Sequence, residues 1–524
     1  MQRPLAVRLR PGQAQRFTLP LAQRDCAFGR FQGPGRGLQV RVLDPSGKRT
    51  MRRFASRAAG PLELDVCVEL AGRYQVVVSA EEPGDFTLEL QQVLGRPSSP
   101  PPRAAGPALT SPRLSALARE LADPARAKQA LKRFWREVEQ HGTPLLEPAD
   151  VDNLLVTFLY RANPQTRGVS VSWPMYMGQF QQNAMAALPG SDVFWKSIKL
   201  PRATRFSYQL VIDAPRDPSP GRELGERPER AVSRSDPRNP RLLTPDPALD
   251  AFSQRSLLEL PDAPKERWSS GPLAPRGRLE HTLIASEVLG NVHPLSVYLP
   301  RGYDPKSPYP LLIFFDGEQY VDELRTPEML DRLVAARAIT PLVAVFVRNA
   351  SPHSRDEELP CNPRFARFVI EELLPQLWGR YSLSRDPRQV GLAGSSFGGL
   401  AASYIALEHP AFFGKVLSQS GSYWWSFPSG DPSYDGSAAP GWLRRRYQQR
   451  PRAALELYLS AGTFESGAAH GGVLEHNRLQ RDALRALGYS VAYQELIAGH
   501  DPLAWRAALP DGLIALFGMA AGPK

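Results

Sequence analysis

The segment Gly394-Ser395-Ser396-Phe397-Gly398 has the spacing of a nucleophile elbow, in which a serine lies between two glycines at a sharp turn. A serine hydroxyl attacks a carbonyl only when a base removes its proton and donors stabilise the oxyanion that forms. Residues 389–393 have the pattern of a strand and residues 400–407 that of a helix, so Ser396 falls at a strand-to-helix turn. The pattern therefore predicts acyl transfer with Ser396 as the nucleophile.

The base of such a serine should lie further along the chain, on the loop after the last strand of the sheet. His500 follows a predicted strand at 490–496 and precedes a predicted helix, so it lies in that loop. His470 and His476 come before this strand, and we expect them to be surface residues. The sequence therefore predicts His500 as the general base.

The acid that fixes the tautomer of the imidazole should follow the preceding strand. Glu465 is the first carboxylate after the predicted strand at 454–460. Glu475 is the rival candidate, but it lies on a predicted helix, where we expect a surface pair with Arg478. Glu465 is the favoured acid, and Glu475 stays open as the alternative.

Two backbone N–H groups should form the oxyanion hole. One donor is expected from Phe397, directly after the nucleophile. The other is expected from the segment Phe315-Asp316-Gly317-Glu318, where Gly317 permits a close approach of the backbone. An ordinary Asp-Gly turn is the alternative for this segment.

A mostly parallel sheet would bring these residues to one edge. From residue 279 onward, short apolar runs alternate with helical patterns, which is typical of a parallel sheet with helices on both faces. Strands are predicted at 279–287, 293–299, 310–315, 341–347, 388–394, 415–419, 454–460 and 490–496, and helices at 326–337, 362–378, 397–408, 471–487 and 502–517. The order of strand, serine, acid and base is that of an α/β-hydrolase fold.

The first half of the chain is predicted to contain two β-sandwich domains. Residues 1–95 and 150–215 alternate apolar and polar positions in short runs separated by turn signals. Between them, residues 94–113 are rich in proline, and a helical pattern follows over 113–141. Residues 214–248 combine Pro, Arg, Asp and Glu with little apolar periodicity, so we expect a mobile loop or an extended arm there.

Length and charge limit the classes of partner. The 524 residues suggest about three domains. The 64 Lys+Arg and 53 Asp+Glu residues give a net charge of +11, which would attract a polyanion. Because much of the excess is arginine beside proline in the linkers, where it favours solubility, we expect no nucleic-acid partner. No run approaches about 18 uninterrupted apolar residues, so no membrane-spanning helix is expected.

The cysteines and the first residues bear on the compartment. Cys26, Cys67 and Cys361 are sparse and lack the paired spacings of a zinc site. They fit a reducing compartment, with Cys26 and Cys67 as two small buried side chains; a disulfide between them is the alternative if their strands are neighbours. Residues 1–17 show no apolar run of a signal peptide. We therefore expect the cytoplasm, with the periplasm as the alternative if a signal peptide has been removed.

Several segments together resemble the enterochelin (enterobactin) esterase family. They are 417–425 (LSQSGSYWW), 499–506 (GHDPLAWR), 355–362 (RDEELPCN) with Phe365 and 372–375 (ELLP), and the N-terminal-domain-like stretch 150–215. The segment 355–362 is similar to a part of that family rich in substrate contacts. Two features depart from the family: residues 1–95 are additional, and the interval from Glu465 to His500 is longer.

The resemblance completes the predicted fold, which is α/β with four parts. Residues 1–95 are expected to form a β-sandwich, and residues 96–149 a Pro-rich linker with helices. Residues 150–278 are expected to form an immunoglobulin-like β-sandwich, similar to the N-terminal domain of enterochelin esterases, with a long loop. Residues 279–524 are expected to form the α/β-hydrolase catalytic domain.

The resemblance also implies a reaction, namely hydrolysis of the lactone esters of a ferric catecholate siderophore of the enterobactin type, with release of iron. A ferric tris-catecholate is an aromatic trianion, which guanidinium groups and flat side chains can bind. The candidate substrate-binding residues are Arg355, Asn362, Tyr423, Trp424, Trp425, Trp505 and Arg506. Core packing is the alternative for the aromatic residues, and we expect it of at least one of Trp424 and Trp425. Iron would arrive as part of the substrate, so we expect neither a cofactor nor a protein metal site.

Two other functions stay open. One is a serine esterase that acts on other acyl esters, for example of the feruloyl type, and it would hydrolyse a simple aryl ester but not enterobactin. The other is a siderophore carrier without catalysis, and it would bind its ligand equally well after the change Ser396→Ala.

Overall fold

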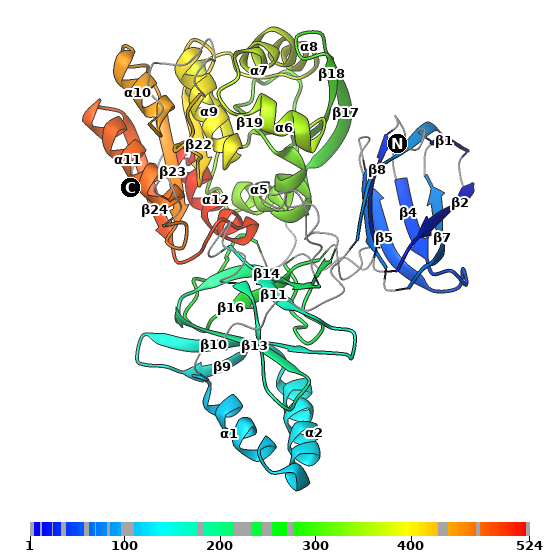
Figure 1. Ribbon diagram of the computed structural model, residues 1–524. Helices are drawn as coiled ribbons and strands as arrows, with labels where there is room; N and C mark the ends of the chain where they lie inside the picture. Colours follow the sequence, from blue (N-terminus) through cyan, green and yellow to red (C-terminus); the bar gives the residue numbers. More distant parts are fainter. Residues whose placement is uncertain are drawn as a thin grey trace. The chain divides into compact units, whose positions relative to one another are not determined.

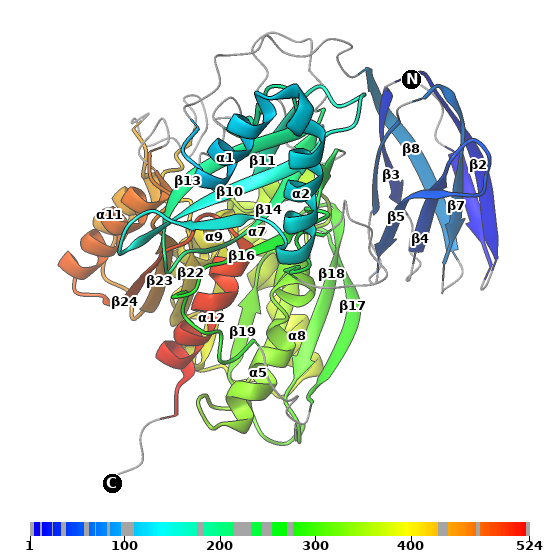
Figure 2. The same cartoon turned by 90° about the horizontal axis from the view of Figure 1, so that it is seen from below.

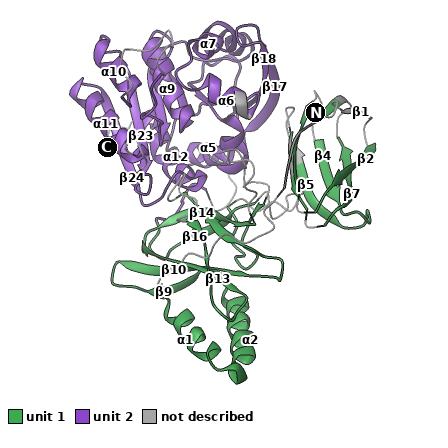
Figure 3. Ribbon diagram, viewed as in Figure 1, with its two compact units in different colours: residues 1–263 green, residues 264–524 purple. Residues whose placement is uncertain are grey.

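The computed structural model divides into two compact units, residues 1–263 and 264–524 (Figures 1 and 3). It describes residues 5–10, 13–23, 25–32, 38–56, 62–68, 70–80, 84–95, 109–174, 183–213, 232–243, 254–269, 276–427, 439–467 and 472–519. Each unit has hydrophobic cores of its own.

The second unit is built on an eight-stranded sheet with the order β17-β18-β20-β19-β21-β22-β23-β24. The strands are β17 (Arg278–Ser286), β18 (Asn291–Leu299), β19 (Leu311–Phe314), β20 (Val343–Val347), β21 (Val390–Ser395), β22 (Lys415–Gln419), β23 (Glu456–Gly462) and β24 (Ser490–Leu496). β17 and β18 form an antiparallel hairpin, and β18 is antiparallel to β20. From β20 to β24 every pair is parallel, so the carboxyl ends of six strands meet at one edge.

Helices cover both faces of this sheet, because successive residues of a strand point to opposite faces. Leu311 and Ile313 belong to one core, together with residues of α8 (Leu374–Arg380), α9 (Phe397–Glu408), α10 (Trp442–Gln449) and α11 (Val473–Ala486). Leu312 and Phe314 belong to the other, together with residues of α5 (Thr326–Ala335) and α12 (Pro502–Phe517). The three-layer arrangement is therefore the mixed α/β fold that the alternating pattern predicts.

The predicted strands of this unit are confirmed to within two residues at each end, and α9 and α12 have their predicted bounds. The predicted helix at 362–378 is instead α7 (Pro363–Arg367), a π-helical segment (Phe368–Leu373) and α8. Pro375 in α8 has no N–H to donate to the carbonyl four residues earlier, which interrupts the regular helical ladder there. Two short helices, α6 (Pro352–Glu358) and α10, were not predicted.

Residues 5–95 of the first unit form two antiparallel sheets of four strands each, with the orders β1-β8-β3-β6 and β2-β7-β4-β5. The strands are β1 (Leu5–Leu9), β2 (Ala14–Leu21), β3 (Asp25–Gln32), β4 (Leu38–Leu43), β5 (Thr50–Ser56), β6 (Leu62–Cys67), β7 (Gly72–Ser79) and β8 (Gly84–Gly95). Buried residues of both sheets, such as Phe31 and Val76, share one core.

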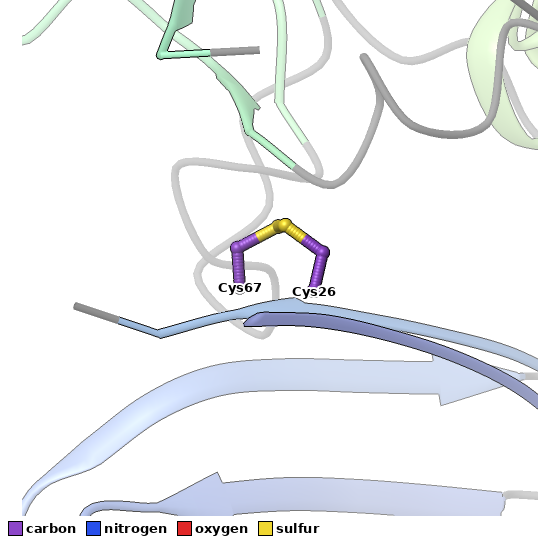
Figure 4. The surroundings of a disulfide bond; sticks show 2 residues. All are labelled: Cys26 and Cys67. Atoms are coloured by element: carbon purple, nitrogen blue, oxygen red, sulfur yellow. A yellow bond between two sulfur atoms is a disulfide. The ribbon is translucent and has the colours of Figure 1, made fainter. Parts of the chain in front are cut away.

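Cys26 and Cys67 are joined by a disulfide bond, which Figure 4 shows. They lie directly opposite each other on the neighbouring strands β3 and β6. The expectation of two reduced cysteines was therefore wrong, because the sequence does not reveal which of the short strands become neighbours. Cys361 is a free, buried cysteine.

The rest of the first unit, as far as the structure describes it, contains two further antiparallel sheets of four strands each. Their orders are β12-β13-β10-β9 and β11-β14-β15, with β16 paired to β14, and the strands are β9 (Leu145–Pro148), β10 (Asn153–Arg161), β11 (Val169–Ser172), β12 (Ala186–Ala187), β13 (Val193–Pro201), β14 (Arg205–Ile212), β15 (Ser233–Arg234) and β16 (Ser256–Glu259). Helices α1 (Pro112–Leu121) and α2 (Pro124–His141) share a core with β9, β10 and β13. Figure 2 shows both helices next to β10 and β13. The helices and β9 thus pack with this β domain, although the sequence places them in a separate linker.

Two expectations for connecting segments fall largely outside the described residues. These segments are most of the Pro-rich linker, residues 96–108, and residues 214–231 and 244–248 of the predicted loop or arm. The described part of that loop, 232–243, contributes β15. In the described ranges no helix is both long and apolar enough to cross a membrane.

Candidate active site

Ser396 lies in a tight turn at the carboxyl end of β21, where α9 begins. Its backbone has φ 56° and ψ −122°, which a non-glycine residue rarely adopts and which is typical of a strained nucleophile elbow. The turn closes because Gly394 and Gly398 touch: a Cβ on Gly394 would lie 2.4 Å from the carbonyl carbon of Gly398. A side chain at position 394 would therefore force the elbow apart.

Two neighbouring segments hold this turn. The N–H of Ser396 donates to the carbonyl of Gln419 at the end of β22 (2.9 Å), and the N–H of Ser422 donates to the carbonyl of Ser396 (3.1 Å). The hydroxyls of Ser396 and Ser422 lie 3.3 Å apart. Within the described parts of the chain, Ser422 is the hydrogen-bond partner of the Ser396 hydroxyl, and His500 is not.

Glu465 and His500 form a hydrogen-bonded pair. Nδ1 of His500 lies 2.8 Å from Oε1 of Glu465. The second carboxylate oxygen accepts a hydrogen bond of 2.8 Å from the N–H of Gly462, at the end of β23. The Glu465 side chain is 1% exposed and that of His500 is 14% exposed, so the pair is shielded while the imidazole keeps some access. The structure thus joins the favoured acid, and not Glu475, to the predicted base.

The loop after β24 places His500 directly before α12. Asp501 caps this helix by accepting a hydrogen bond from the N–H of Leu503 (2.6 Å). Trp505, one turn into the helix, meets the imidazole edge to face, with ring centroids 5.0 Å apart. Its indole N–H donates to the hydroxyl of Ser420 (2.9 Å). Trp505 is 6% exposed, so it packs against His500 in the interior. It is therefore not the exposed substrate-binding side chain that the sequence predicted.

The segment after β19 is more than an ordinary turn. Asp316 is buried with φ 56°, and a Cβ on Gly317 would lie 2.6 Å from the backbone of Phe346. Glycine is therefore required at position 317 by close packing on β20. The N–H of Gly317 has no hydrogen-bond partner in the described ranges, and that of Phe397 lies in the first turn of α9, where N–H groups have no partner within the helix.

Arg355 binds Asp316 through two hydrogen bonds, from Nε (2.6 Å) and from Nη2 (2.8 Å). Burial lowers the pKa of Arg355, but the charge and hydrogen bonds of Asp316 outweigh burial and raise it above its usual value. Asn349 donates to the same carboxylate (2.6 Å) and to that of Glu318 (2.7 Å). Burial and the charge of Asp316 raise the pKa of Glu318. Arg355 was predicted to bind substrate, whereas its geometry makes it an anchor of this loop.

Three more predicted substrate-binding residues have other partners. Asn362 caps α7, since its side chain accepts from the N–H of Arg364 (2.8 Å) and donates to the carbonyl of Glu357 (2.9 Å). Arg506 forms an ion pair with Glu266 at 2.9 Å. Tyr423 is fully buried, and its hydroxyl bonds that of Ser403 at 2.6 Å. Burial also raises the pKa of Tyr423 to about 12. The sequence could not reveal these roles, because burial and partners depend on the tertiary fold.

The two consecutive tryptophans of the segment 417–425 differ. Trp425 packs against the core and meets Phe427 edge to face, with centroids 4.5 Å apart, as expected for one of the pair. Trp424 is partly exposed, and its ring centroid lies 6.0 Å from that of Phe397, the residue after Ser396. Both tryptophans are partly exposed, but it is Trp424 that contacts Phe397, so Trp424 is an aromatic residue available beside the elbow.

Expectations for the remaining histidines and for Glu475 differ in outcome. His470 lies outside the described residues. His476 was expected at the surface, but it is 5% exposed on the buried face of α11. The predicted Glu475–Arg478 pair is wrong as well: Arg478 binds Glu495 at 2.6 Å, because β24 lies alongside this helix. In the described ranges no group of three or more His, Cys, Asp or Glu side chains could hold a metal ion.

The residues that sequence reasoning missed are Asn349, Gln419, Ser420 and Ser422. Gln419 is the last residue of β22, and Ser420 and Ser422 follow this strand, close to the elbow. Their position at or just after the carboxyl end of a parallel strand could have marked them as candidates for the site. This position does not reveal which side chains contact Ser396.

Comparison with known proteins finds family matches in both units of the structure. Residues 286–516 match the family described as "Putative esterase", and residues 155–269 match the family described as "Enterochelin esterase, N-terminal". An iron(III) enterobactin esterase of Escherichia coli is 31% identical over 345 residues, which are 64% of this chain and 82% of the relative. An iron(III) enterobactin esterase of Dickeya dadantii is 29% identical over 406 residues, which are 72% of this chain and 91% of the relative.

Solved structures agree with the sequence matches. The enterobactin esterase of Shigella flexneri, crystallised in the presence of enterobactin, superposes with a TM-score of 0.59 at 27% identity, over 73% of this chain and 97% of that one. The ferric enterobactin esterase of Salmonella typhimurium gives a TM-score of 0.58 at 28% identity, over 74% and 98%. The chain therefore belongs to the enterochelin esterase family.

Proposed function

We propose that this protein is a serine esterase that hydrolyses the trilactone esters of a ferric catecholate siderophore of the enterobactin type and thereby releases iron. The observation that carries the proposal is the Glu465–His500 pair at 2.8 Å at the same edge of the parallel sheet as a strained serine elbow, in a chain of the enterochelin esterase family. Relatives named iron(III) enterobactin esterase and iron(III) salmochelin esterase support the substrate class.

In the proposed reaction, His500 takes the proton of the Ser396 hydroxyl as its oxygen attacks a lactone carbonyl. The buried Glu465 carboxylate stabilises the imidazolium that forms. The N–H groups of Phe397 and Gly317 stabilise the oxyanion. His500 then gives the proton to the leaving alkoxide, and a water molecule, activated in the same way, releases the acyl group from Ser396. No cofactor is proposed, because these steps use only side chains and backbone, and iron enters as part of the substrate.

Recognition of an anionic, aromatic substrate needs a cation that is not neutralised by a carboxylate. Arg444 on α10 meets this need: its Nη1 is buried and has no hydrogen-bond partner in the described ranges. Its guanidinium packs against Gly441, whose N–H donates to the carbonyl of Trp424 (3.2 Å). We propose that Arg444 and Trp424 contact the catecholate groups, in place of the arginines that bind Asp316 and Glu266.

Mass spectrometry of the products from ferric enterobactin, with the unchanged protein and with Ser396→Ala, tests the proposal. Dihydroxybenzoylserine fragments are expected from the unchanged protein only. Their absence, together with hydrolysis of a simple aryl ester, would favour an esterase for other acyl esters. Binding of ferric enterobactin without turnover in either protein would favour a carrier.

We further propose that residues 5–95 are an appended β-sandwich domain and that the protein works in an oxidising compartment. Disulfides persist mainly in such compartments, so the Cys26–Cys67 bond favours the periplasm, the alternative to the cytoplasm expected from the first residues. Fractionation of cells, followed by thiol labelling under denaturing conditions, tests this. Labelling of all three cysteines in freshly isolated protein would contradict it.

A further inference from the structure

Ser422 is the side chain whose hydroxyl meets that of Ser396, at 3.3 Å, and it is 2% exposed. It comes from the loop after β22 and not from the elbow, so two separate segments bring the hydroxyls together. None of the steps proposed above uses this residue. A second buried hydroxyl in contact with the reacting atom therefore needs an explanation.

The backbone around Ser422 is held from three sides. Its N–H donates to the carbonyl of Ser396 (3.1 Å), and its carbonyl accepts from the N–H of Trp425 (3.0 Å). The carbonyl of the preceding residue, Gly421, accepts from the side chain of Asn477 on α11 (2.8 Å). Because hydrogen bonds hold the loop to the elbow and to α11, the hydroxyl of Ser422 is already placed near Ser396 before the reaction. The loop therefore does not have to become ordered during catalysis.

Which of the two hydroxyls, Ser396 or Ser422, donates the hydrogen bond follows from the single hydrogen that each carries. A hydroxyl has one hydrogen and two acceptor sites. When the hydrogen of Ser396 points to His500, its oxygen can only accept from Ser422. As the proton moves to His500, negative charge grows on Oγ of Ser396, and a hydrogen bond to a charged oxygen is stronger than one to a neutral oxygen. The interaction thus strengthens on the way to the transition state, which is the condition for raising kcat.

We propose that Ser422 is a further catalytic residue, whose hydroxyl donates to Oγ of Ser396 and stabilises the charge that develops there during attack. Ser422 forms no covalent bond and loses no proton. The inference rests on Ser396 as the nucleophile, which is part of the proposed function, but it does not depend on the identity of the substrate.

The test measures the acylation rate of Ser396 with p-nitrophenyl acetate in single turnovers and with a fluorophosphonate probe. Ser422→Ala is expected to lower both rates by ~10- to 100-fold, the effect of losing one hydrogen bond to a charged group, with KM for the ester unchanged. Ser384→Ala is the matched control, because Ser384 is also a buried serine (7% exposed), but its hydroxyl accepts from the backbone N–H of Asp386 and does not contact Ser396. It is expected to keep the unchanged rates.

Either of two results would overturn the inference: unchanged rates in Ser422→Ala, or faster rates, which would mean that Ser422 restrains the nucleophile. If Ser422→Ala does not fold, Ser422→Cys keeps the shape with a much weaker donor and should show the same slow acylation. Failure of the proposed function has a different signature, because the probe would then leave Ser396 unlabelled in the unchanged protein.

Discussion

Oε1 of Glu465 lies 2.8 Å from Nδ1 of His500, although 35 residues separate them in the chain. Because a carboxylate only accepts, Nδ1 carries the hydrogen and Nε2 keeps the lone pair that a base needs. The other carboxylate oxygen accepts from Gly462, so the pair is fixed to the end of β23. The tautomer of the proposed base, His500, thus depends on the packing of two neighbouring strand ends.

Glu465→Gln should lower kcat by ~10²- to 10⁴-fold with little change in KM, because an amide supports the wrong imidazole tautomer. The measurement is steady-state hydrolysis of an aryl ester. Glu475→Gln is the matched control, since Glu475 was the rival acid, and it should keep its kcat. Equal losses in the two variants would contradict the assignment of Glu465.

Gly394→Ala should destabilise the catalytic unit by about 1–3 kcal/mol and slow labelling of Ser396, because its Cβ would lie 2.4 Å from Gly398. Gly379→Ala is the control: a Cβ there meets nothing within 4 Å, and alanine in a helix is favoured over glycine by about 0.5–1 kcal/mol. Urea unfolding and fluorophosphonate labelling measure the two effects. Normal labelling of a stable Gly394→Ala protein would show that the elbow does not need this contact.

Arg355→Met should lower kcat for a neutral aryl ester as well as for an anionic one, because the change leaves the buried Asp316 without its bidentate partner. Breaking a buried pair in this way costs about 3–5 kcal/mol of stability. Steady-state kinetics measured with both esters separate a structural role of Arg355 from a role in binding substrate. A higher KM for the anionic ester alone, with an unchanged melting temperature, would instead return Arg355 to the substrate-binding residues.

Arg444→Met should raise KM for a catecholate ester by ~10-fold or more and leave the kinetics of a neutral aryl ester unchanged, because the lost guanidinium is proposed to bind only the anionic groups. Arg388→Met is the control, since Arg388 is an exposed arginine paired with Asp386. Equal KM values for Arg444→Met and the unchanged protein would remove Arg444 from the proposed site.

The double change Cys26→Ala and Cys67→Ala should lower the stability of the N-terminal sheets by about 2–4 kcal/mol, because the disulfide closes a loop with a sequence separation of 41 residues. Esterase activity should persist, since the catalytic unit has its own core. Melting curves with and without a reductant provide the measurement. A melting temperature that a reductant leaves unchanged would contradict a stabilising disulfide.

Local patterns in the sequence predicted the eight strands of the second unit and the candidates Ser396, His500 and Glu465, but not the short helices α6 and α10. These features are local, because each can be recognised from residues that are close together in the sequence. They are the glycines of the elbow, the apolar runs of buried strands, and the position of a residue just after a strand. A parallel sheet brings the carboxyl ends of its strands to one edge. Because Ser396, Glu465 and His500 each follow a strand, the sequence already predicted that they lie near one another.

Which side chains are buried, and which partners they have, became clear from the three-dimensional structure and not from the sequence. Arg355 and Arg506 carry the charge that an anionic substrate needs, but each has a carboxylate from a distant segment, Asp316 and Glu266. Cys26 and Cys67 became a disulfide because β3 and β6 pair side by side. Long-range pairing of this kind depends on how strands and loops pack across the fold, which no local pattern encodes.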